Sequence, residues 1–240
     1  MKKIILLLLL GSLFSCNKSL QSNPKTSKGL LVATWTNYTS NDTTIDTYEY
    51  DSKNRMSKRT ETDKFSTSLY SYQYDNDDDL TGFTITSGNT SEAYHIIYAN
   101  GQPAYSTVGS DTTTFCSFTV QENKVTKIYY PAQGYYDTVT YTGNNIATLQ
   151  QVPQSFFFPS YDVYGTKNGP YKNSRFKWYL NISGTSNHLM EYDENDMVSN
   201  GQSSQSTQLI PIVYNDQGYP VKMTYSNGAQ INVFTYKTAN

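Results

Sequence analysis

Cysteine is scarce in this chain of 240 residues, where only Cys16 and Cys116 occur. Two cysteines allow one disulfide at most, so no disulfide framework is expected to hold the fold together. Cys116 lies in "TFCSFTV", and its apolar and β-branched neighbours predict a small buried strand residue in place of a reactive thiol. The fold must therefore be stabilised by packing, for which the length is sufficient.

Histidine is equally scarce, and the common catalytic motifs are missing. His95 in "AYHIIYA" and His188 in "SNHLMEY" have no cysteine or histidine at metal-binding spacing. The sequence has no G-x-S-x-G, no H-E-x-x-H and no phosphate-binding glycine loop. We therefore predict no catalytic residues, no metal and no cofactor. Carboxylate pairs of hydrolases have no fixed spacing, so a carbohydrate-active hydrolase stays as the alternative.

Clusters of positive charge are also lacking. The chain has 18 basic and 20 acidic residues, with no strong local excess of lysine or arginine. Binding to phosphates needs a basic face, so nucleic acid is not expected as a partner.

Long apolar runs are absent except at the N-terminus, which reads "MKKIILLLLLGSLFSCNKS". Two lysines precede the run from Ile4 to Leu10, which is far shorter than the roughly 20 residues of a spanning helix. This pattern predicts a signal peptide over residues 1–15.

The stretch "LFSC" resembles the lipobox of bacterial lipoproteins. The resemblance implies that Cys16 is acylated and becomes the first residue of the mature chain, with residues 16–29 as a tether. Asn17 in the next position implies an outer-membrane lipoprotein, on the periplasmic side or at the cell surface. The membrane is then a partner through the lipid on Cys16. An ordinary secretory signal with a chance cysteine is the simpler alternative to a lipobox.

What the sequence has in abundance is tyrosine, 23 residues, together with threonine, serine and asparagine. Tyrosine and threonine favour strands, and the small polar residues favour turns, so the composition predicts an all-β fold. One apolar position recurs every 21 to 24 residues, apart from a gap of 51, and is followed by a polar turn. The anchors are Tyr50, Tyr74, Tyr98, Val120, Tyr141, Tyr192, Tyr214 and Tyr236.

Each period has room for one β-hairpin, so residues 30–240 predict an antiparallel up-and-down meander of about 14–16 strands. A twisted sheet of that size curls into a barrel or partial barrel. The acidic copy "YDNDDDL" is interpreted as a hairpin tip. An EF-hand loop starting at Asp75 would need glycine and glutamate where Leu80 and Thr86 stand.

The copies that begin "YD" are similar to the tyrosine-aspartate repeats of Rhs-type shells. Together with the lipobox, they resemble Bacteroidetes-type lipoproteins of unknown function with a porin-like fold. That resemblance covers roughly residues 30–240 and implies a curved single-layer barrel without transferable catalytic residues. Strands such as "MSKRTETDK" lack an apolar face for lipid, so a soluble domain on a lipid tether is expected instead of a pore.

The repeat breaks at about residues 152–188, where Pro153, Pro159 and Pro170 disfavour a regular central strand. This segment is rich in aromatic residues and is expected to plug the concave face of the sheet. The alternative is an aromatic platform for a glycan or lipid ligand. Its candidate contacts are Phe157, Tyr161, Tyr164, Trp178 and Tyr179. The function expected overall is a lipid-anchored, non-catalytic binding or scaffold module.

Overall fold

The computed structural model describes residues 29–240, except for positions 111, 154–159, 175–193, 204 and 226–227. The described residues form 17 strands in one antiparallel sheet. The strands are β1 (Leu30–Thr39), β2 (Thr43–Tyr50), β3 (Met56–Thr62), β4 (Thr67–Tyr74), β5 (Leu80–Ser87), β6 (Thr90–Ala99), β7 (Gln102–Val108), β8 (Thr114–Gln121), β9 (Lys124–Tyr130), β10 (Tyr135–Thr142), β11 (Asn145–Val152), β12 (Ser160–Asn168), β13 (Asn195–Gly201), β14 (Gln208–Leu209), β15 (Ile212–Tyr214), β16 (Pro220–Tyr225) and β17 (Gln230–Thr238).

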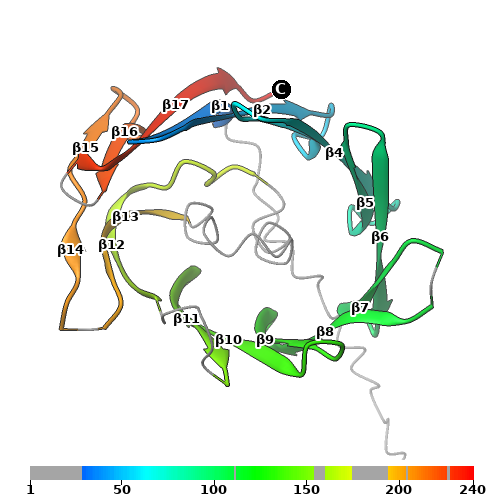
Figure 1. Ribbon diagram of the computed structural model, residues 1–240. Helices are drawn as coiled ribbons and strands as arrows, with labels where there is room; N and C mark the ends of the chain where they lie inside the picture. The colour runs from blue at the N-terminus through cyan, green and yellow to red at the C-terminus, as the bar shows by residue number, and fades with distance from the viewer. Residues whose placement is uncertain (1–28, 111, 154–159, 175–193, 204, 226–227) are drawn as a thin grey trace, which may run out of the picture.

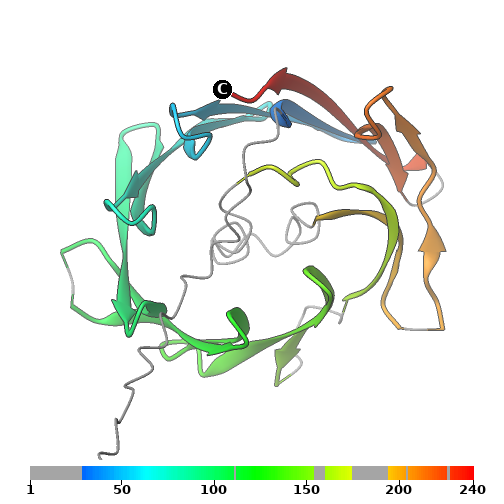
Figure 2. The same cartoon turned by 180° about the vertical axis from the view of Figure 1, so that it is seen from behind.

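Neighbours in sequence are neighbours in the sheet, and the wall they form curves into a ring (Figures 1 and 2). The first strand, β1, pairs with both β2 and the last strand, β17. In the described part of the chain, β14 pairs with β13 and β15 pairs with β16, and the ladder is interrupted between β14 and β15, so the sheet is not closed into a barrel. The predicted all-β meander, curled into a partial barrel, is therefore confirmed.

The strand count exceeds the expected 14–16 because the last third of the ring contains two very short strands, β14 and β15. The expectation of no regular strand in the interrupted segment also needs correction, since β12 lies between Pro159 and Pro170. Proline removes a ladder donor only at its own position, which leaves residues 160–168 free to pair.

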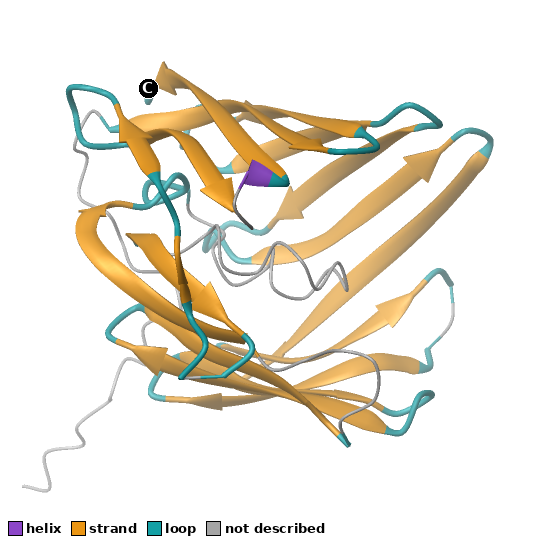
Figure 3. Ribbon diagram, turned by 60° about the vertical axis from the view of Figure 1, so that its left-hand side comes forward, coloured by secondary structure: helices purple, strands orange, loops and turns teal. Residues whose placement is uncertain are grey.

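The two faces of the wall differ in character, as the alternation of each strand requires. Tyr70 and Tyr72 of β4 are buried, whereas Ser71 between them lies on the other face. Figure 3 shows the curved wall of strands in an oblique view. The buried side chains form the main core around the inside of the ring. That core contains Val32, Trp35, Tyr48, Met56, Tyr70, Tyr72, Leu80, Phe83, Ile96, Tyr171, Met197, Ile210, Met223, Tyr225 and Phe234. The other face is rich in threonine, with cross-strand hydroxyl pairs such as Thr34–Thr235 and Thr140–Thr148.

Tyrosine hydroxyls connect successive hairpins in a recurring way. A tyrosine near the end of one strand donates to the backbone carbonyl of a residue 16 or 18 positions earlier, at or near the start of a preceding strand. The pairs are Tyr74–Met56, Tyr98–Leu80, Tyr141–Val125, Tyr164–Ile146 and Tyr236–Pro220. Tyr164 makes this contact from within the interrupted segment, whereas Tyr192, which the spacing suggested as an anchor, lies outside the described residues.

Three of the hairpin tips share one turn geometry. The Asp75 carboxylate accepts the backbone N–H groups of Asp77 and Asp79, at 3.0 and 2.8 Å. Asp51 and Asn215 accept the corresponding N–H groups of their own turns. The first carboxylate of "DNDDD" is therefore used to order the turn, in agreement with the interpretation as a hairpin tip.

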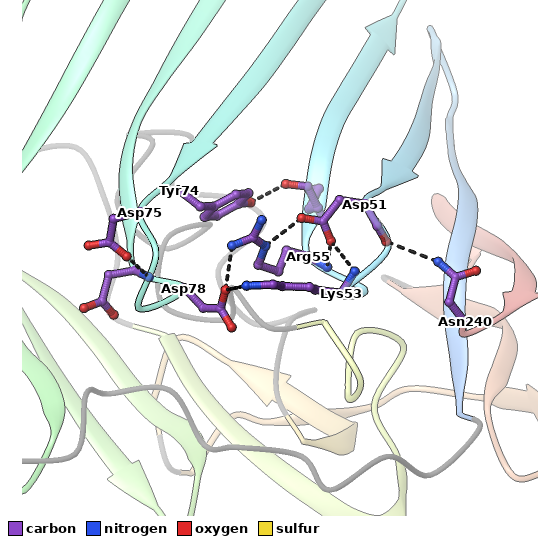
Figure 4. A network of polar contacts seen from close by, with 9 residues as sticks. Asp51, Lys53, Arg55, Tyr74, Asp75, Asp78 and Asn240 are labelled. Atoms are coloured by element: carbon purple, nitrogen blue, oxygen red, sulfur yellow. Dashed lines mark hydrogen bonds and ion pairs between the residues drawn. The ribbon is translucent and has the colours of Figure 1, made fainter.

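Two of these tips are tied together at one rim of the ring (Figure 4). Asp78 pairs with Arg55 at 2.7 Å and with Lys53 at 2.6 Å, and Arg55 also pairs with Asp51 at 2.6 Å. The backbone N–H of Asn240 donates to the side-chain oxygen of Asn54, which fixes the end of the chain to the same rim. Arg55 thus links the turn of its own hairpin, through Asp51, to the turn of the neighbouring hairpin, through Asp78.

No helix in the described part of the chain is long and apolar enough to cross a membrane.

Candidate functional site

The inside of the ring is crossed by the segment that comes after β12, residues 169–174, which we call the crossing segment. It runs beneath β17 and β1 (Figures 1 and 2). Tyr171 at its centre is 1% exposed, and its ring meets those of Tyr48 and Phe234 edge to face, at 5.6 and 6.3 Å between centroids. The side chain of Asn173 donates to the Leu30 carbonyl at 2.9 Å. Residues 169–174 therefore pack against the inside of the wall, whereas most aromatic residues of the predicted plug lie outside the described residues.

Next to the crossing segment, the wall carries a set of ionisable side chains on β2 and β3, which we call the inner-wall ion cluster: Asp46, Tyr48, Arg59 and Glu61. The Arg59 Nε donates to Asp46 Oδ1 at 2.8 Å, and its second nitrogen donates to Glu61. The Tyr48 hydroxyl lies 3.3 Å from Asp46 Oδ2 and 2.8 Å from the Tyr171 hydroxyl. The cluster therefore connects the wall to the crossing segment.

The sheet register explains how these residues meet. Asp46 lies opposite Glu61, and Tyr48 lies opposite Arg59, so all four share the inner face of adjacent strands. The Arg59 guanidinium also lies over the Tyr70 ring of β4, at 4.8 Å from the centroid. This stacking gives the guanidinium a third neighbour and fixes its plane.

The electrostatics of the cluster are dominated by burial. Asp46 is fully buried and Arg59 is 2% exposed. Desolvation raises the pKa of Asp46 to about 6, against the opposing effect of the Arg59 charge and hydrogen bond. Two carboxylates share one guanidinium, so the cluster has one negative charge in excess when all three are ionised. Such a cluster fixes how β2 and β3 lie relative to the crossing segment. It contributes little to the net free energy of unfolding, because desolvation offsets most of the attraction.

Two further carboxylates on the wall have raised pKa values. Burial raises the pKa of Asp137 on β10 to about 6, opposed by the hydrogen bond from Tyr130. Burial also raises the pKa of Asp162 on β12 to about 7, opposed by the Ser160 hydroxyl, which lies 3.1 Å from both carboxylate oxygens. The two strands are separated by β11, so these carboxylates belong to separate environments.

The residues predicted as ligand contacts do not form one platform. Tyr161 lies opposite Thr148, whose hydroxyl pairs with Thr140 on the outward face. Tyr164 lies opposite buried Met197 and donates to the Ile146 carbonyl, on the inward face. The sheet therefore separates these two tyrosines. Phe157, Trp178 and Tyr179 lie outside the described residues, as does the predicted lipidation site Cys16.

The scarce cysteine and histidine residues have ordinary surroundings. Cys116 on β8 is fully buried, with its sulfur 3.1 Å from the Ser106 hydroxyl, which confirms the buried strand residue. Burial raises the pKa of this thiol to about 11, so it stays protonated at neutral pH. His95 is exposed on β6, and His188 lies outside the described residues. The described residues contain no group of three or more potential metal ligands.

Sequence reasoning missed the inner-wall ion cluster. From the sequence alone, the strand containing Arg59 is predicted only to be too polar to face lipid. A usable signal was present in the alternation: Asp46 and Tyr48, like Arg59 and Glu61, are two residues apart and so share a face. The side of the sheet that this face belonged to could not be known without the register.

No family model matches the chain. No curated protein matches it either. Among solved structures, the fold is similar to that of a porin-like protein from Bacteroides uniformis, with a TM-score of 0.53 and 12% sequence identity. The match covers 86% of this chain and 98% of the other. The similarity shows a shared all-β, porin-like fold.

Proposed function

We propose that this chain is a lipid-anchored protein of the bacterial envelope and acts as a non-catalytic binding or scaffold module. The anchor is supported by the "LFSC" stretch, in which Cys16 would receive the lipid. The porin-like fold fits an envelope protein. The lipid would be inserted in the outer membrane, and the protein would lie on its periplasmic side or at the cell surface.

The observation that carries the non-catalytic part is the position of Arg59 between Asp46 and Glu61. These two carboxylates lie opposite each other and would be the natural acid pair for a hydrolase. Both are held by the same guanidinium, and Asp46 is fully buried next to Tyr48 and the crossing segment. A general acid must reach the substrate, so we assign this pair to the architecture of the wall.

Fractionation of cells that express the Cys16→Ala variant tests the anchor. The wild-type chain should incorporate labelled palmitate and sediment with outer membranes, whereas the variant should do neither. Cys116→Ala is the matched control and should keep both label and membrane association, because Cys116 is buried in the sheet. Palmitate labelling that persists in the Cys16 variant would refute the anchor.

The non-catalytic assignment has its own test. The purified chain is incubated with neutral polysaccharides, and newly released reducing ends are measured. No release is expected from the wild-type chain. Release that disappears in Glu61→Gln but not in Glu49→Gln would show a hydrolase and overturn this part of the proposal.

A further inference from the structure

The outward face carries one feature that its threonine-rich surroundings do not share. The register places five side chains on one line across five consecutive strands, from β6 to β10. We call this line the outward tyrosine row; in order, it consists of Ile97, Tyr105, Ser117, Tyr129 and Tyr136. Each member lies directly opposite the next, so the row runs perpendicular to the strands.

These side chains face away from the core. Their neighbours Ile96, Ser106, Cys116, Ile128 and Tyr130 are all buried. Ile97, Tyr105 and Tyr129 are 38%, 36% and 41% exposed, respectively. Large apolar side chains grouped in this way on a surface mark a contact site more often than scattered ones do.

The spacing of the tyrosines is set by the sheet. Neighbouring strands are about 4.8 Å apart, so Tyr105 and Tyr129, separated by β8, are about 10 Å apart. Ser117 between them is small and leaves room above the sheet. This spacing is close to the length of one disaccharide unit in an extended polysaccharide. One ring can therefore contact a sugar while the other ring contacts the sugar two positions further along.

The charge of this face selects among ligands. The five strands β6 to β10 contain two acidic residues, and both lie on the inner side. Glu92 on β6 accepts a hydrogen bond at 2.6 Å from Tyr94, which packs against the main core. Asp137 on β10 lies opposite buried Gln151. The outward line next to the tyrosine row consists of Thr119, Lys127 and Thr138. Lys127 lies over the Tyr136 ring, at 3.6 Å from its centroid. One cation amid hydroxyl groups matches an uncharged, hydroxyl-rich ligand and gives a polyanion little to bind.

We infer that the outward tyrosine row binds an extended neutral polysaccharide, with Tyr105 and Tyr129 as the rings that contact it. Tyrosine suits this role because its flat apolar ring packs on the face of a sugar while its hydroxyl stays hydrated. Lys127 and the threonine hydroxyls provide hydrogen-bond donors beside the rings. The inference rests on the proposed function as a binding module and adds the ligand class and the surface.

The test uses the purified full chain in native gels that contain mixed-linkage β-glucan, glucomannan, soluble starch or, as a polyanion, alginate. At least one neutral polysaccharide should retard the wild-type chain, and alginate should not. The double variant Tyr105→Ala/Tyr129→Ala should bind about tenfold more weakly or worse. Tyr105→Phe/Tyr129→Phe keeps the rings and should retain binding.

Tyr38→Ala is the matched control, because Tyr38 on β1 is 46% exposed on the same outward face but far from the row in the ring. It should bind like the wild-type chain. Thermal melting checks that each variant is folded, and the single Tyr129→Ala variant serves if the double variant is not.

Three results would overturn the inference: no retardation of the wild-type chain by any neutral polysaccharide, equal binding by the double variant, or equal weakening by Tyr38→Ala. Binding to vesicles of phosphatidylethanolamine and phosphatidylglycerol that requires Tyr105 and Tyr129, without polysaccharide binding, would identify a membrane surface instead. Each of these outcomes is independent of Cys16 and its fractionation test. Failure of the polysaccharide inference and failure of the anchor are therefore distinguishable.

Discussion

The arc from β2 to β6 and the arc from β12 to β15 are built from similar residues but differ in regularity. Between β5 and β6, six residue pairs succeed one another without a shift. Between β12 and β13 the register shifts twice, and β13 and β14 share only two pairs. The comparison shows that the tyrosine-rich hairpin is not sufficient for a regular wall.

Two local features explain the irregular arc. Pro211 in "LIPIV" has no N–H to donate, so β14 ends at Leu209 and β15 begins at Ile212. The carboxylate of Asp196 accepts the Lys167 backbone N–H at 2.9 Å and also binds the Tyr214 hydroxyl. A side chain thus takes the place of a ladder partner in this arc. In the regular arc, the ion pairs at the rim instead join two complete hairpins.

The largest effect is expected in the regular arc, from Arg59→Met. This change leaves Asp46 buried next to Tyr48 without its guanidinium. Removing one partner of a buried ion pair costs about 3–5 kcal/mol of unfolding free energy. Urea denaturation at pH 7 measures the loss.

Lys58→Met is the matched control, because Lys58 is the adjacent residue on the same strand and pairs with exposed Glu49 at 3.5 Å. An exposed pair of this kind contributes less than about 1 kcal/mol. Adding Asp46→Asn to Arg59→Met removes the unpaired charge and should recover part of the loss. Equal losses of unfolding free energy for Arg59→Met and Lys58→Met would show that Arg59 is no more important for stability than an exposed ion pair.

A smaller effect is expected in the irregular arc, where Asp162 responds to pH. Its pKa is about 7 in the folded chain and about 4 in the unfolded chain. The folded state therefore binds a proton more tightly, and its stability falls as pH rises from 4 to 7. Below this window both states are protonated, and above it both are ionised, so the contribution is constant on either side.

Asp162→Asn should remove this component of the pH dependence. With allowance for solvent screening of a half-buried group, the variant should lose about 2 kcal/mol less than the wild-type chain between pH 4.5 and 8. Denaturant midpoints across this range measure the difference. Asp216→Asn, in an exposed turn, should leave the curve unchanged. Parallel curves for Asp162→Asn and the wild-type chain would mean that Asp162 is hydrated in the folded state.

Much of the regular arc could be predicted from the sequence, because its information is local. The alternation in "SLYSYQYD" and the polar turn after it specify a strand, its buried face and its hairpin. The inner-wall ion cluster and the outward tyrosine row could not be predicted in this way. Arg59 meets Tyr70, and Tyr105 lines up with Tyr129, only through the register between strands, to which bulges such as that between Ser106 and Thr107 contribute.

The smallest effect compares the same hydrogen bond in both arcs. The Tyr98 hydroxyl donates to the Leu80 carbonyl at 3.0 Å in the regular arc, and the Tyr164 hydroxyl donates to the Ile146 carbonyl at 2.7 Å at the edge of the irregular one. Tyr98→Phe removes the donor while the Leu80 carbonyl stays buried, and should cost about 1 kcal/mol of unfolding free energy. Tyr164→Phe should cost less, because β12 is joined to β11 by only two residue pairs and can adjust its position after the hydroxyl is removed. Tyr105→Phe, at an exposed position, is the control and should change nothing measurable.

Urea midpoints of the three variants, determined side by side, test the comparison. A loss for Tyr164→Phe equal to or larger than that for Tyr98→Phe would show that the irregular arc is packed as tightly as the regular one, despite its broken ladders.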